Sequence, residues 1–220
     1  MNLKTKSRNE ILLVTLRFET EIYVNMVEYE IKYQANRSML SQVIEDLSYV
    51  GQKQQNDTYY DTPNYNLFLN AVFLRKRNDK VVDIKYNFDK TDISHLFCNE
   101  TSFKLPLSED AKNSFDVFLS QLIQSVKNDD DIFRKYQLEE FVVINKSREI
   151  YQGNDIEVSF DIVENLGEFI EIEAKTEKGI NSIKNYIQSK NIQRITTGYV
   201  ELYLKKYNYN LYQKGKYLTK

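Results

Sequence analysis

The pentapeptide Glu28-Tyr29-Glu30-Ile31-Lys32 carries an alternation of charged and apolar residues on which the fold prediction rests. In a β-strand, successive side chains point to opposite faces, so this pentapeptide places two carboxylates and an ammonium group on one face and Tyr29 and Ile31 on the other. Carboxylate oxygens bind divalent cations, and a lysine binds phosphate. The charged face is therefore either a solvated surface or part of a ligand site. Whether the later strands repeat the same pattern distinguishes the two.

The composition is that of one globular domain. The chain has 220 residues, 41% of them hydrophobic and 28% charged, which is enough for one sizeable core. A net charge of −2 argues against a surface built to follow long nucleic acids. We expect residues 26–220 to form this single domain, with residues 1–25 as an N-terminal extension whose status the sequence leaves open.

Single cysteine and histidine residues restrict the chemistry. Cys98 alone cannot form an internal disulfide or a cysteine-rich zinc site, which suits a reducing compartment. His95 is the one histidine, so any metal has to be bound by oxygen ligands. We find no apolar run of membrane-spanning length and no export signal, and we expect a cytoplasmic protein with no membrane partner.

Alternating and helical patterns predict an α+β fold. A helix is expected from Asn36 to Gly51, a turn at Asp61-Thr62-Pro63-Asn64, and a hairpin around Asn78-Asp79. Further strands are expected at 100–105, 141–150, 156–163 and 168–174. Two more helices are expected, one beginning after Ser108 and one at 179–190, and the segment from Tyr199 is either a helix or a strand.

The strands share an unusual division between charged and apolar faces. Val158, Phe160 and Ile162 alternate with Glu157, Ser159 and Asp161, and Ile172 and Ala174 oppose Glu171 and Glu173. A sandwich would turn the charges out to water, whereas a closed antiparallel barrel would point them into a wet cavity and cover its apolar outer wall with helices. The charged strand residues are six acids and six bases: Glu28, Glu30, Glu100, Asp161, Glu171 and Glu173, with Lys32, Arg75, Arg77, Lys85, Lys146 and Arg148.

Buried charges of both signs suit one kind of ligand. Burying an ion costs several kcal/mol unless it is paired, so both sets need counter-charges. Mg²⁺ or Mn²⁺ on the acids and a polyphosphate on the bases would satisfy both at once. The inferred ligand is a small-molecule triphosphate bound with its metal.

In motif order, the chain resembles the CYTH superfamily of triphosphate tunnel enzymes. The motifs are Glu28-x-Glu30-x-Lys32, Tyr59-Tyr60-Asp61-Thr62-Pro63, Leu74-Arg75-Lys76-Arg77, Lys146-Ser147-Arg148, Asp161 and Leu166-Gly167-Glu168-Phe169-Ile170-Glu171-Ile172-Glu173. Two segments depart from the family pattern. Only Glu100 carries over from a segment that often reads R-x-E-x-E, and Gly198 replaces the serine of S-Y-x-E-L.

The resemblance implies an eight-stranded antiparallel barrel forming a tunnel, with helices packed outside. It implies that Glu28, Glu30, Glu171 and Glu173 are catalytic metal ligands, to which the barrel argument adds Glu100 and Asp161. It also implies that the substrate is held by Lys32, Arg75, Arg77, Lys85, Lys146 and Arg148.

The leading function is a metal-dependent triphosphatase acting on inorganic triphosphate or a related organic triphosphate. The alternative is a class IV adenylate cyclase, because Gln55-x-Asp57-x-Tyr59 resembles that branch. Thiamine triphosphatase is disfavoured because that branch is thought to stack a tryptophan on thiamine, and this chain has none. A tail rich in lysine and tyrosine, from Lys205 to Lys220, leaves an RNA 5′-triphosphatase open as the nucleic-acid alternative. A tunnel that only binds polyphosphate also stays open, as either a monomer or a homodimer.

Overall fold

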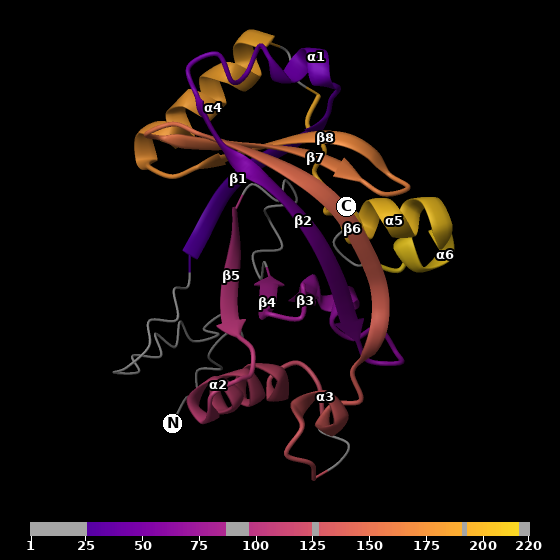
Figure 1. Ribbon diagram of the computed structural model, residues 1–220. Helices are drawn as coiled ribbons and strands as arrows, with labels where there is room; N and C mark the ends of the chain where they lie inside the picture. Colours follow the sequence, from indigo (N-terminus) through magenta and orange to yellow (C-terminus); the bar gives the residue numbers. More distant parts are fainter. Residues whose placement is uncertain (1–25, 87–96, 125–127, 191–192, 216–220) are drawn as a thin grey trace, which may run out of the picture.

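The computed structural model describes residues 26–86, 97–124, 128–190 and 193–215. Its described strands form a closed, fully antiparallel barrel in the order β1-β5-β4-β3-β2-β6-β7-β8 (Figure 1). Their bounds are β1 Met26–Gln34, β2 Ser48–Asp61, β3 Val72–Arg77, β4 Val81–Tyr86, β5 Phe97–Lys104, β6 Glu139–Gln152, β7 Ile156–Val163 and β8 Gly167–Ala174. The predicted α+β barrel of eight strands is confirmed. The N-terminal extension, His95 and the last five residues of the basic tail lie outside the described residues.

Closure of the barrel depends on β1, which pairs with a different strand along each half. Its first residues pair with β5, with Met26 opposite Glu100. The second half pairs with β8, with Glu30 opposite Glu173 and Lys32 opposite Glu171. The charged side chains of residues 28–32 and those of β8 are therefore cross-strand neighbours on the same face of the sheet.

The predicted β3–β4 hairpin is confirmed. Asn78 and Asp79 have φ values of 51° and 53°, the left-handed pair at the centre of a type I′ turn, and the Lys80 N–H donates to the Arg77 carbonyl at 3.0 Å to close it. Asn and Asp tolerate this conformation better than larger residues do. The turn sets the register in which Arg75 lies opposite Asp83 and Phe73 lies opposite Lys85, so these side chains share one face.

The helices are α1 Arg37–Leu40, α2 Glu109–Ser120, α3 Ile132–Lys135, α4 Glu177–Lys190, α5 Tyr199–Tyr207 and α6 Tyr209–Tyr212, with a 3₁₀ turn η1 at Phe68–Asn70. The helix predicted up to Gly51 was wrong beyond Leu40, because the chain enters β2 at Ser48 to pair with β6. Its apolar stripe still packs, through Leu40, Val43 and Leu47, against the barrel. The predicted Ser108 cap is present, with its hydroxyl accepting the Ala111 N–H at 3.3 Å.

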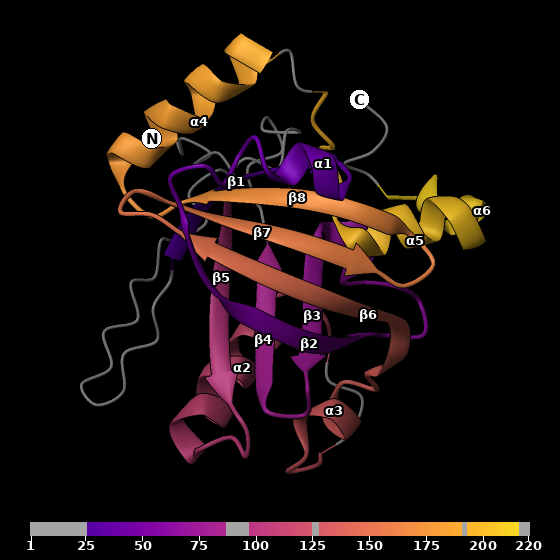
Figure 2. The same ribbon diagram turned by 45° about the horizontal axis from the view of Figure 1, so that its top comes forward.

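Helices cover two separate parts of the apolar outer wall (Figures 1 and 2). Side chains of α4, including Ile183, pack with Ile31 and Phe160. Side chains of α2 and α3, including Phe115 and Ile132, pack on the β3–β5 side. Among the helices of the described ranges, none combines the length and apolar character that a membrane span needs.

Helix α5 has a different place. Its Val200 and Leu204 cluster with Val142, Ile144 and Phe169. By strand alternation, these three residues lie on the same face as Lys146, Arg148 and Glu171, which is the inner face of the barrel. The apolar side chains of α5 therefore fill part of the barrel interior, beside the charged residues.

Candidate functional site

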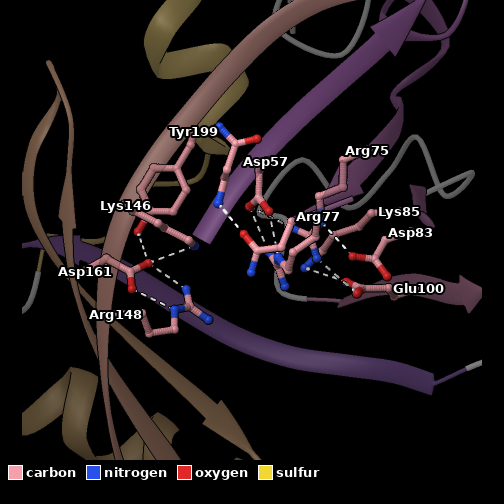
Figure 3. A network of polar contacts seen from close by, with 12 residues as sticks. Asp57, Arg75, Arg77, Asp83, Lys85, Glu100, Lys146, Arg148, Asp161 and Tyr199 are labelled. Carbon is pink, nitrogen blue, oxygen red and sulfur yellow. Dashed lines mark hydrogen bonds and ion pairs between the residues drawn. The ribbon is translucent and has the colours of Figure 1, made fainter. Parts of the chain in front are cut away.

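The inner face encloses a cavity of about 260 Å³. All six bases predicted to hold a substrate line it, and so do four glutamates of the strands. The lining residues that concern the site are Lys32, Arg75, Arg77, Lys85, Lys146 and Arg148, with Glu30, Glu100, Glu171 and Glu173. Six strands supply these charges, so the barrel brings together residues that are far apart in the sequence (Figure 3).

Two arginines of β3 are each held by an aspartate. Arg77 forms a two-point contact with Asp57, with Nε–Oδ1 at 2.7 Å and Nη2–Oδ2 at 2.8 Å. Arg75 donates from Nε to Asp83 Oδ2 at 2.8 Å and from Nη2 to Glu100 Oε1 at 3.2 Å (Figure 3). Despite the cost of burial, the carboxylates around Arg75 raise the pKa of its guanidinium well above the ordinary value.

On the opposite side of the cavity, Asp161 gathers three donors. Arg148 donates from Nε at 2.7 Å and from Nη2 at 2.6 Å, Lys146 donates at 3.0 Å, and the Tyr199 hydroxyl donates at 2.8 Å. The Asp161 side chain is fully buried. Burial opposes ionisation of this carboxyl, but Arg148 and Lys146 hold its pKa below the ordinary value, so Asp161 is an anion.

Glu171 and Lys32 form a second pair in the same region. The ammonium group of Lys32 lies 3.0 Å from Glu171 Oε1, and Arg148 donates to the other oxygen of the same carboxylate. Burial works against the charge on Glu171, yet the two cations lower its pKa well below the ordinary value. The carboxylate is therefore ionised and available as a ligand for a cation.

The Tyr199 ring lies between two lysines. Lys32 Nζ is 4.1 Å and Lys146 Nζ is 4.7 Å from the ring centroid, so the negative face of the aromatic ring contacts both ammonium groups. Burial, with repulsion from Arg148, lowers the pKa of Lys146 to about 8. Lys146 therefore loses its charge at a lower pH than an ordinary lysine does.

The carboxylates fit a hard divalent cation, although in the described residues each glutamate turns towards a base and no three candidate ligands converge. Glu30 and Glu173 lie directly opposite each other across β1 and β8, and like charges in that arrangement repel unless a cation lies between them. Carboxylate oxygens are the ligands that Mg²⁺ and Mn²⁺ prefer. Glu28 lies in β1 at the same strand phase as Glu30, but its side chain is outside the described residues.

Some residues of the site were not predicted. Asp57 and Asp83 bind the two arginines of β3. Strand alternation could have indicated them, because each lies on the same face as the arginine opposite it on the neighbouring strand. Tyr199 and Glu201 line the cavity from α5, where no pattern pointed inward. Burial raises the pKa of Glu201 to about 7, and its carboxylate accepts the Gly198 N–H at the start of the helix.

The backbone of the segment before α5 also joins the cavity. Ile195 donates its N–H to the Lys32 carbonyl at 2.7 Å, and residues 194–201 contribute to the lining.

The turn predicted at Asp61-Thr62-Pro63-Asn64, where β2 ends, is confirmed. The buried Asp61 carboxylate there accepts backbone N–H groups of Leu67 at 2.9 Å and Phe68 at 2.8 Å, so the turn is held by structural contacts.

Comparison with solved structures supports the fold. A protein of Pyrococcus horikoshii, PH1819, has a TM-score of 0.57 and 22% identity, covering 81% of this chain and 99% of that chain. A putative adenylate cyclase from Bacillus halodurans has a TM-score of 0.51 and 16% identity, covering 83% and 97%. A putative adenylyl cyclase from Hippeastrum, described as having a dominant triphosphatase activity, has a TM-score of 0.50 and 16% identity, covering 87% and 97%.

None of the curated proteins matches the sequence. The family comparison is more direct, because the CYTH domain model matches residues 26–194, which is more than half of the chain. This match includes the strands that carry the six bases and four glutamates of the cavity. The chain therefore belongs to the CYTH domain family.

Proposed function

We propose that the protein is a metal-dependent triphosphatase that hydrolyses inorganic triphosphate or a related organic triphosphate inside the barrel. The observation that carries the proposal is that six bases and four glutamates of the strands line a single cavity. Such a set supplies counter-charges both for a polyphosphate and for the cation that accompanies it. The family to which the chain belongs contains triphosphatases and adenylate cyclases, and both act on triphosphates.

The bases would bind and orient the substrate. Arg75 and Arg77 on β3 and Arg148 on β6 offer planar N–H groups that match phosphate oxygens, and Lys32, Lys85 and Lys146 offer point charges. Asp83 and Asp57 already hold Arg75 and Arg77 before a ligand arrives, so these guanidinium groups are oriented in advance. Orientation of this kind can contribute several kcal/mol to catalysis, on the order of 7–11 in well-aligned systems.

The acids would hold the metal. We assign this role to Glu30, Glu100, Glu171 and Glu173, which line the cavity, and to Glu28 by its strand phase, with Mg²⁺ or Mn²⁺ as the ion. When bound, such a cation neutralises charge on the phosphoryl oxygens and makes a bound water more acidic. Asp161, expected earlier as a further ligand, is fully buried behind Arg148, Lys146 and Tyr199 and does not line the cavity, so we propose a positioning role for it.

A class IV adenylate cyclase is the second candidate. Two of the solved structures with this fold are described as putative adenylate or adenylyl cyclases, and the Hippeastrum protein is described as predominantly a triphosphatase. The same cavity could position ATP so that its ribose hydroxyl attacks the α-phosphate and pyrophosphate leaves. Incubation with ATP and Mn²⁺ separates the two activities, because a cyclase releases cyclic AMP and pyrophosphate whereas a triphosphatase releases orthophosphate.

The test is a substrate panel with a matched pair of variants. Inorganic triphosphate, ATP, thiamine triphosphate and 5′-triphosphorylated RNA are each incubated with Mg²⁺ or Mn²⁺, and the products are identified. Glu171→Ala should abolish metal-dependent phosphate release, whereas Glu149→Ala, which removes the partner of Arg37 on the outer wall, should retain it. Full activity of Glu171→Ala would refute the site assignment, and no turnover of any compound in the panel would refute the enzyme.

A further inference from the structure

The acids of the barrel interior divide into two groups by side-chain length and exposure. Asp57, Asp83 and Asp161 have side chains that are 1%, 4% and 0% exposed. The glutamates Glu30 and Glu100 are 22% and 16% exposed. Among the described residues that line the cavity, the glutamates are present and the three aspartates are not.

The aspartates contact the bases from behind. A carboxylate one methylene from the backbone stays close to its strand, so it reaches the part of a cross-strand base nearest the sheet. Asp83 accordingly accepts from Nε of Arg75 at 2.8 Å, and Asp57 accepts from Nε and Nη2 of Arg77 (Figure 3). These contacts leave the cavity side of the base unobstructed.

The glutamates instead contact bases from the cavity side, and Arg75 is contacted from both sides. Glu100 Oε1 lies 3.2 Å from Nη2 of Arg75, and Glu30 Oε1 lies 3.3 Å from Nζ of Lys85. Across the cavity, Glu171 Oε1 lies 3.0 Å from Nζ of Lys32. A phosphate oxygen entering the cavity needs these same N–H groups, so the glutamates compete with an anion for them.

We propose that the cavity glutamates are exchangeable counter-ions, so that the site takes a triphosphate together with its divalent cation in preference to free triphosphate. This inference rests on the proposed function, since it concerns the same cavity. Binding of a cation to the glutamates withdraws them from Arg75, Lys85 and Lys32, and the released N–H groups then donate hydrogen bonds to the phosphate oxygens. Because coupling between two ligands is reciprocal, each ligand raises the affinity for the other.

The test measures binding without metal, by calorimetric titration of inorganic triphosphate in excess chelator. Glu100→Gln removes the competing charge from the cavity side of Arg75, so metal-free affinity should rise about fivefold or more, the lower end of typical coupling. Asp83→Asn is the matched control, because it removes one negative charge from the same arginine on its protected side. Its gain should be clearly smaller than that of Glu100→Gln.

A second measurement uses the metal. With Mg²⁺ and the imido analogue of triphosphate, which resists hydrolysis, the cation should tighten binding less in Glu100→Gln than in the wild type. Glu30→Gln should behave in the same way, because it removes the carboxylate charge that contacts Lys85 from the cavity. If Asp83→Asn does not fold, Glu149→Gln serves as the charge control, since it frees Arg37 on the outer wall.

Equal gains in Glu100→Gln and its charge control would overturn the exchange, because a general change of electrostatic field would then suffice. No gain in Glu100→Gln would overturn it too. Hydrolysis assays on the same preparations separate the two proposals. If the wild type hydrolyses triphosphate but Glu100→Gln gains no more affinity than Asp83→Asn, the exchange alone is refuted. If Glu100→Gln gains more affinity than Asp83→Asn but the wild type hydrolyses nothing, the proposed function is refuted and the exchange stands.

Discussion

Replacing Asp161 with alanine should destabilise the protein severely. Its fully buried carboxylate accepts hydrogen bonds from Arg148 at 2.7 and 2.6 Å, from Lys146 at 3.0 Å and from Tyr199 at 2.8 Å. Removing one partner of a buried ion pair costs about 3–5 kcal/mol, because the remaining charge stays buried without its counter-charge. In a chain of about this size each kcal/mol lowers Tm by roughly 2–4 °C, so we expect a fall of roughly 6–20 °C.

The assay is thermal unfolding followed by circular dichroism, with urea unfolding to give the free energy. Glu149→Ala is the control, because it breaks a two-point contact to Arg37, whose side chain is 58% exposed, and exposed pairs contribute only about 0–1 kcal/mol. Asp161→Asn should fall between them, since its amide oxygen can still accept from Tyr199. If Asp161→Ala loses no more stability than Glu149→Ala, the inner charges are solvated and the reasoning about the cavity fails.

Three further predictions concern pH and packing. Because the pKa of Lys146 is about 8, metal-free triphosphate affinity should fall as the pH rises through that value, and calorimetry should show no such fall in Lys146→Arg, which stays charged. The pKa of Glu201 is about 7 in the folded protein and about 4.5 in the unfolded chain, so the free energy of unfolding falls as the pH rises from about 4.5 to about 7. Glu201→Gln does not titrate, so urea unfolding should show that it is more stable than the wild type by up to about 3 kcal/mol at alkaline pH and little different in acid. Gly179→Ala would place a Cβ atom 2.1 Å from the Asp155 carbonyl oxygen, so thermal unfolding should show a loss of about 1–3 kcal/mol unless the start of α4 shifts.

Strand alternation predicted the fold where one face of a strand is buried. The strands predicted at 156–163 and 168–174 correspond to β7, Ile156–Val163, and β8, Gly167–Ala174. It failed for β2, which runs from Ser48 to Asp61, because most of its first half is exposed and carries few apolar residues. Pairing along β6 forms that strand, and tertiary pairing of this kind leaves no local signal.

The bases of the site were predictable, but most of their partners were not. Parity alone placed Arg75 and Arg77 on one face, and the hairpin turn was recognisable at Asn78-Asp79. Their contacts with Asp83 and Asp57 depend on register across two strand pairs. The contact of Tyr199 with Asp161 joins residues 38 positions apart, and only the closed barrel brings them together.

Tyr199 shows why the cavity depends on the last part of the described chain. The tyrosine comes from α5, yet its hydroxyl donates to Asp161 on β7 and its ring contacts Lys32 on β1 and Lys146 on β6. The Ile195 N–H bond to the Lys32 carbonyl anchors the segment just before it. Since two of the bases that would bind phosphate are held by this ring, the packing of α5 and the affinity for a triphosphate share the same side chains. A ligand that draws Lys32 and Lys146 towards its oxygens therefore acts on the contacts that hold α5 in the barrel, so occupancy of the cavity and the docking of this helix are thermodynamically linked.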